Sequence, residues 1–156
     1  MKNNILSQLF SHFNTSIHLR YLTIIAMLII PFTYLLNGGW QYHVDSMDYI
    51  EGFSSVKNGN DWYDHNIALR PGAVYLSLPF SIVFSPANSL GIHNSIFFVM
   101  FGPLMYFFTR DILNNQTLAF YSALLFLFSF PTIYWGLAIG NDLGSWFFLL
   151  LSTFLS

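Results

Sequence analysis

Long apolar stretches without charge alternate with short polar segments along this chain. Residues 21–36 carry no charged side chain, and the charge-free stretch continues to Val44. A helix rises about 1.5 Å per residue and the hydrocarbon core of a bilayer is about 30 Å thick, so roughly 20 apolar residues cross it. We therefore predict a membrane-crossing helix at 21–37, in which Pro31 is tolerated. A cleaved signal peptide is the alternative, but "NGGW" at 37–40 lacks the small-x-small cleavage pattern.

A second charge-free stretch, residues 71–109, is too long for one crossing and is divided by the polar turn "SPANS" at 85–89. Its first part, 71–84, would reach only about 21 Å as a helix. That length is short of the hydrocarbon core, so we expect this part to lie along the membrane surface. The remaining crossing helices are predicted at 90–109, 118–139 and 143–156.

These segments predict an all-α membrane protein with about four transmembrane helices. The first 20 residues (1–20) would be cytoplasmic or interfacial. Residues 21–156 would be the N-terminal part of a polytopic domain whose external loop, 38–89, holds amphipathic interfacial helices. In this topology Arg20 and Arg110 share the cytoplasmic side, as the positive-inside tendency prefers. The final apolar segment has no polar end, so we expect the chain to be a piece of a larger membrane protein.

The amino-acid composition supports a membrane protein and excludes some kinds of binding partner. The chain is 54% hydrophobic and 8% charged, whereas soluble domains carry roughly 25% charged residues. It has no cysteine, which excludes disulfides and thiolate metal sites. Its net charge is -2 without a basic run, so nucleic acid is not an expected partner.

Most of the acidic residues gather in one polar segment. Five of the seven lie there: Asp45, Asp48, Glu51, Asp61 and Asp64. The pattern "DSMDYIEGFSSVKNG…LRPGAVYLSLPFSIVF" resembles the first external loop of polytopic GT-C glycosyltransferases. More narrowly, it is similar to the family 39-like group, which includes protein mannosyltransferases and the aminoarabinose transferase that modifies lipid A. The matching positions are Asp45, Ser46, Tyr49, Gly59, Arg70, Pro71 and Gly72.

A second match lies downstream, in "FPTIYWGLAIGNDLGSWFFLLL". It resembles the family's Pro-rich helix end, which is followed by an acidic residue and an aromatic-rich helix. Asp142 occupies the position of that acid, and Asn141 departs from the Thr or Ser that commonly precedes it. The likeness covers about residues 19–156, so the chain resembles a truncated GT-C-like transmembrane module.

The resemblance implies an inverting glycosyltransferase of the EC 2.4 class. Such an enzyme moves a sugar from a polyprenyl-phosphate donor to a lipid, glycan or protein acceptor outside the cytoplasm. The expected location is a bacterial inner (plasma) membrane, as a multi-pass protein in the bilayer with an outward-facing active site. We expect residues 1–156 alone to be inactive. A membrane transporter or a non-enzymatic membrane scaffold is the alternative; a transporter would place ionisable groups within crossing helices near the midplane.

The chemistry assigns a role to each candidate residue. A carboxylate suits removal of the acceptor's proton, particularly when it is partly buried. Asp45 and Asp142 are the catalytic candidates, although each could instead be a helix N-cap, and Asp45 with Asp48 resembles a capping box. A guanidinium matches phosphate oxygens, which points to Arg70 as the carrier contact; headgroup anchoring by snorkelling is its alternative. The other substrate-binding candidates are Asp48, Tyr49 and Lys57.

No cofactor is required by this chemistry, and a divalent metal is an alternative. His and carboxylate side chains suit Zn²⁺ or Mn²⁺. The residues that could form such a site lack a tight ligand spacing, so we assign no metal ligand. They are His43, Asp45, Asp64 and His65.

Overall fold

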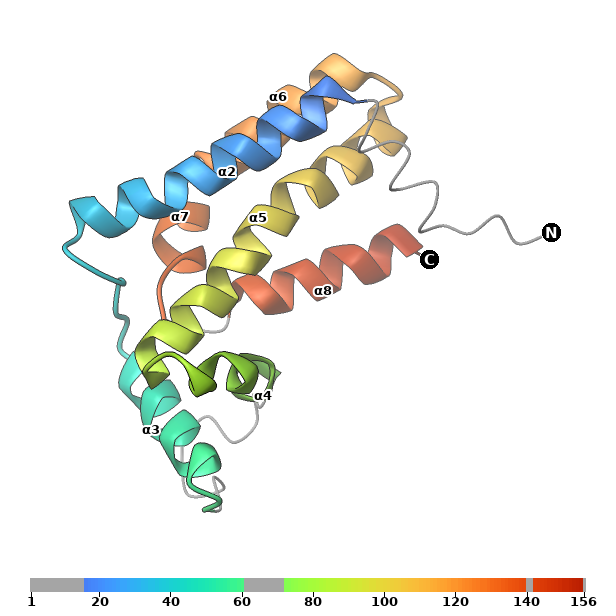
Figure 1. Ribbon diagram of the computed structural model, residues 1–156. Helices are drawn as coiled ribbons and strands as arrows, with labels where there is room; N and C mark the ends of the chain where they lie inside the picture. The colour runs from blue at the N-terminus through green and yellow to red at the C-terminus, as the bar shows by residue number, and fades with distance from the viewer. Residues whose placement is uncertain (1–15, 61–71, 140–141, 156) are drawn as a thin grey trace.

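The computed structural model describes residues 16–60, 72–139 and 142–155, and these parts of the chain form an all-helical assembly (Figure 1). The surface helix expected within 1–20 falls mostly outside the described residues. The helices are α2 (Ile17–Leu36), α3 (Ser46–Lys57), α4 (Gly72–Ser77), the 3₁₀ helix η1 (Leu78–Ile82), α5 (Pro86–Leu113), α6 (Gln116–Leu127), α7 (Phe130–Gly136) and α8 (Asp142–Leu155).

Two of these helices are long and apolar enough to cross a membrane, by length and composition. They are α2, with 20 residues, and α5, with 28 residues. Helix α2 begins before the predicted crossing segment 21–37 and ends at Leu36. Helix α5 includes the predicted segment 90–109 but begins at Pro86, so most of the predicted polar turn at 85–89 is helical. At the start of α5 the Ser85 hydroxyl accepts a bond from the backbone N–H of Asn88 at 3.4 Å. The helix ends at Asn114, which adopts a left-handed φ of 47°, a conformation that Asn tolerates.

The long helix α5 lies at the centre of the structure, where it contacts α2, α4, α6 and α8. Small residues let α6 approach it closely. Ala119 and Ala123 of α6 are completely buried, and a Cβ at Gly102 of α5 would lie 3.0 Å from a Leu127 methyl. Close backbone approach of this kind is a common way to pack apolar helices when the hydrophobic effect does not drive them together.

The segment predicted as one helix at 118–139 is instead two helices, α6 and α7, so that prediction was wrong. The helical conformation is interrupted at Ser129. The Ser129 hydroxyl accepts a hydrogen bond from the Thr132 N–H at 3.4 Å and so caps α7. Pro131 stands in the first turn of α7, where its missing N–H and fixed φ fit a helix start. An apolar count cannot detect this break, because Phe128 and Phe130 keep the segment apolar across it.

The helices run alternately between two ends of the molecule. Figure 1 shows α2 and α6 side by side in the same direction, with α5 and α8 running back. The His18 ring lies 4.9 Å from Phe120 and 6.1 Å from Tyr106, centroid to centroid. The start of α2 therefore meets the end of α5, which places Arg20 and Arg110 at one end and α3 at the other.

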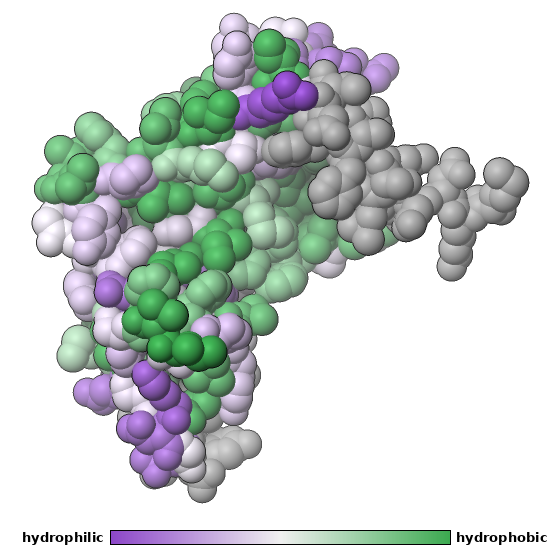
Figure 2. Space-filling model, in the orientation of Figure 1, coloured by the Kyte–Doolittle hydropathy of each residue, from purple (hydrophilic) through white to green (hydrophobic). Residues whose placement is uncertain are grey.

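Polar and apolar surface separate along the same axis. Figure 2 shows hydrophilic residues at the tip of α3 and at the corner where α5 turns into α6, with hydrophobic surface between them over α2. Many large apolar side chains of α2 face outward, including Leu28 (63% exposed), Phe32 (63%) and Leu35 (77%). A helix with so much exposed apolar surface requires an apolar environment or a partner.

Candidate functional site

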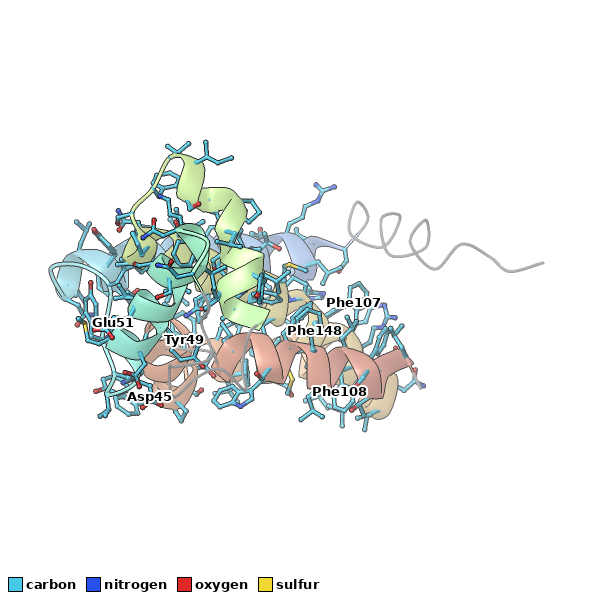
Figure 3. All side chains as sticks on the ribbon, turned by 90° about the horizontal axis from the view of Figure 1, so that it is seen from below. Asp45, Tyr49, Glu51, Phe107, Phe108 and Phe148 are labelled. Atoms are coloured by element: carbon cyan, nitrogen blue, oxygen red, sulfur yellow. The ribbon has the colours of Figure 1, made fainter. Side chains whose placement is uncertain are left out.

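The acidic residues around α3 lie at the end of the molecule opposite Arg110. Asp45, at the N-cap position, and Glu51 are exposed, whereas Asp48 is half-buried. Figure 3 shows Asp45, Tyr49 and Glu51 together at this end. Within the described residues the Asp45 side chain makes no capping hydrogen bond with α3. The capping-box interpretation of Asp45 is therefore wrong, and its carboxylate is available for other interactions.

The burial that favours a catalytic carboxylate is not found at Asp45. The buried residues of α3 are instead Ser46, Tyr49, Gly52 and Phe53, because that face packs on α4 and α5. Tyr49 is 1% exposed and belongs to a small apolar cluster with Val74, Leu90 and Ile139. This burial leaves Tyr49 almost no surface for a substrate, and its ring anchors α3 in place.

Ser46 links the start of α3 to the segment that precedes α8. Its hydroxyl accepts a bond from the His43 N–H at 2.6 Å and donates one to the carbonyl of Ile139. The Ile139 N–H donates to the carbonyl of Gln41 at 2.9 Å, and Tyr42 forms a parallel bridge with Ile139. Two segments more than 90 residues apart are thus joined through backbone groups.

The first turns of α5 complete this linkage. The Asn94 amide donates to the carbonyl of Ala138, and the Trp40 indole N–H donates to the Asn88 side chain at 3.0 Å. The Trp40 ring lies directly on Gly91, where any side chain would overlap it. We call the pairs Ser46–Ile139, Asn94–Ala138 and Trp40–Asn88 the polar clamp.

The polar clamp brings the beginnings of α3 and α8 to the same end of the molecule. Asp142 is the first residue of α8 and follows Ile139 by three residues, a span of at most about 10 Å of extended chain. Asp45 directly precedes Ser46. The polar clamp therefore places the starts of α3 and α8 at one end of the bundle, and a carboxylate at the start of α8 is favoured by the helix dipole. The side chain of Asp142 lies outside the described residues.

The remaining candidates are less connected to this site. Lys57 is exposed, and its ammonium donates to the carbonyl of Ser81 at 3.0 Å, which ties the end of α3 to η1. Arg70, Asp64 and His65 lie outside the described residues. In the parts of the chain that the structure describes, no group of three potential ligands could hold a metal ion.

Sequence reasoning missed the partners of the clamp on α5. Four polar residues gather in the first turns of α5: Asn88, Ser89, His93 and Asn94. Ser89 and His93 share one face because they are four residues apart. Polar residues at that spacing in a crossing helix indicate a buried polar contact. That signal could have predicted the polar face of α5, although not its partners Trp40 and Ala138.

Comparison with known proteins adds no family assignment. No protein-family model, curated protein or solved structure matches the chain.

Proposed function

We propose that the chain is the N-terminal membrane module of a glycosyltransferase that takes its sugar from a polyprenyl-phosphate carrier. The polar clamp is the observation that carries this proposal. It holds the two acid-bearing segments singled out by their sequence patterns, around Asp45 and Asp142, at one end of the helix bundle. A site for a polar acceptor requires polar groups that are far apart in the sequence to be placed at one end of the bundle.

The arrangement of the helices supports a membrane position for this site. Helices α2 and α5 are each long enough to cross, and α6 and α7 could cross together as a broken helix. With Arg20 and Arg110 at the cytoplasmic end, as the positive-inside tendency prefers, α3 and the start of α8 face outward.

The short pair α4 and η1 fits the interfacial role expected for residues 71–84. The pair has 6 and 5 residues, too few to cross a bilayer. Ala73 and Val74 are buried, whereas Tyr75, Leu76 and Ile82 are exposed. An apolar exposed face beside the acidic end suits a helix pair that rests on the membrane surface.

In the proposed reaction an acceptor hydroxyl or amine attacks the anomeric carbon of the donor sugar. The new bond forms as the bond from that carbon to the phosphate oxygen breaks, and polyprenyl phosphate leaves. Asp45 takes the acceptor's proton, because its exposed carboxylate can reach a bound acceptor. Asp142 orients the acceptor, and Asp48 adds negative charge beside Asp45. The positive charges of Arg70 and Lys57 offset the negative charge of the carrier phosphate.

One observation favours a transporter as the second candidate. His93 and Asn94 are buried inside α5 at 4% and 2% exposure, and polar or ionisable groups within a crossing helix often mark a transport path. The acidic residues, by contrast, lie at the end of the bundle rather than along a path through it. This placement favours the transferase.

A transfer assay separates the two candidates. The protein, isolated from the membranes of the cells that make it, is incubated with radiolabelled polyprenyl-phosphate sugars and total membrane acceptors. We expect label to move into a product with a new glycosidic bond, with release of polyprenyl phosphate. Uptake of labelled sugar into proteoliposomes without any such product would contradict the transferase and support the transporter.

A further inference from the structure

The turn between α5 and α6 carries an open polar hollow on the surface of the molecule. The hollow has a volume of about 420 Å³ and is lined by Arg110, Asp111, Asn114 and Gln116. It lies at the corner that Figure 2 shows as hydrophilic, at the end opposite α3. Small-molecule sites have volumes of about 300–1,000 Å³. All four lining residues are polar or charged, so a ligand there would be recognised through charge and hydrogen bonds.

Arg110 and Asp111 place a positive and a negative charge side by side in this hollow. Arg110 Nη2 donates to Asp111 Oδ1 at 3.2 Å, and Nε donates to the same oxygen at 3.4 Å. Neighbouring residues on a helix do not face each other, which accounts for these long bonds. The two side chains are 25% and 54% exposed. An exposed pair of this kind contributes little to stability, so both charged groups can turn to a ligand at little cost.

The surroundings hold the Arg110 guanidinium and bring amide groups beside it. Arg110 Cζ lies 5.2 Å from the centroid of the Phe107 ring, a cation–π contact that favours one orientation of the side chain. The backbone N–H of Asn114 donates to the Arg110 carbonyl at 2.8 Å where α5 ends. The chain then turns, so the side chains of Asn114 and Gln116 both line the hollow. Each amide can donate and accept hydrogen bonds.

The length of α5 places the hollow at the level of lipid head groups. The helix has 28 residues, which gives it a length of about 42 Å, whereas the hydrocarbon core of a bilayer is about 30 Å thick. A helix of that length set across a bilayer extends beyond the core, and Arg110 stands in its last turn. Leu113 and Leu118 flank the turn in the sequence and are 45% and 52% exposed, as contact with acyl chains requires.

We propose that the hollow binds the phosphoethanolamine head group of a membrane lipid, with its phosphate on Arg110 and its ammonium on Asp111. A guanidinium matches phosphate oxygens, and a carboxylate accepts bonds from an ammonium. Two methylene groups separate the charges of this head group, which suits two adjacent charged side chains. A phosphoglycerol head group has no cation for Asp111, and a phosphocholine head group has no N–H to donate. The proposal goes beyond the proposed function and does not depend on sugar transfer.

Native mass spectrometry of the full chain in dodecyl maltoside micelles tests the head-group preference. Dihexanoyl lipids with phosphoethanolamine, phosphocholine or phosphoglycerol head groups are titrated separately. We expect the phosphoethanolamine lipid to bind about tenfold more tightly than the other two, as for one additional hydrogen bond. Equal binding of the three lipids would overturn the proposal. Free phosphoethanolamine, which has no acyl chains, is titrated as well; binding as tight as that of the lipid would assign the hollow to a soluble compound and also overturn the proposal.

Two substitutions test the two charges separately. Arg110→Gln should weaken binding of all three lipids about tenfold, because each contains a phosphate. Asp111→Asn should weaken only the phosphoethanolamine lipid, about tenfold, and remove its preference over the phosphoglycerol lipid. Glu51→Gln removes an exposed charge at the opposite end of the molecule and should leave binding unchanged. Equal effects of Asp111→Asn and Glu51→Gln on the phosphoethanolamine lipid would contradict the assignment of its ammonium to Asp111 and overturn the proposal.

Discussion

In the protein isolated from the membranes of the cells that make it, Asp45→Asn is expected to reduce sugar transfer about 10²–10⁴-fold, the usual loss when a general base is removed. The amide has nearly the same size but cannot take the acceptor's proton. The Asp45 side chain is exposed and makes no capping bond with α3 among the described residues, so the substitution should leave folding and the melting temperature unchanged. The measurement is initial transfer rate per amount of folded protein, with thermal unfolding followed in the same detergent.

Asp48→Asn is the matched control for that experiment. Asp48 lies one turn further along α3 and is half-buried, so removing its charge should reduce transfer much less. Transfer by Asp45→Asn near that of the unchanged protein would rule out Asp45 as the base. Equal losses in both variants would mean that the negative charge of this end matters, rather than proton removal by one residue.

Gly91→Ala is expected to lower the free energy of unfolding by about 1–3 kcal/mol, as overpacking of a close contact does. Even a methyl group at this position would overlap the Trp40 indole. The ring must then move and break its bond to Asn88, which releases one part of the polar clamp. Thermal unfolding and the fluorescence of Trp40, assigned with Trp40→Phe, measure the two effects.

Gly72→Ala provides the comparison for Gly91→Ala. A Cβ at Gly72 meets no described atom within 4 Å, and Ala is favoured over Gly in a helix by up to about 1 kcal/mol. This variant should therefore be as stable as the unchanged protein or slightly more so. If Gly91→Ala were equally harmless, the packing of Trp40 on α5 would not hold the loop in place.

The helices could be predicted from the sequence because an apolar run of sufficient length has few alternatives to a helix. The runs at 21–36 and 90–108 predicted α2 and most of α5. The break between α6 and α7 could not be predicted by counting apolar residues. It depends on Ser129 and Pro131, which lie inside a mostly apolar run. Counting apolar residues measures the length of a segment but does not detect a change in its direction.

The candidate site was predictable in its residue types but not in its connections. A cluster of acids in one polar loop is visible in the sequence. The bond that joins Ser46 to Ile139 links residues separated by 93 positions, and no local pattern specifies such a pairing. The exposure of Asp45 and the burial of Tyr49 follow from which face of α3 packs on α4 and α5. That choice depends on tertiary contacts rather than on the spacing of residues in α3.

Labelling of single cysteines in intact cells tests the central claim most directly, because the chain has no cysteine of its own. Asn60 follows α3 and Gln116 begins α6, and both are exposed at opposite ends of the molecule. With a membrane-impermeant thiol reagent, Asn60→Cys should react from outside, whereas Gln116→Cys should react only after permeabilisation. Reaction of both from outside, or the reverse pattern, would contradict an outward-facing acidic end and with it the proposed site.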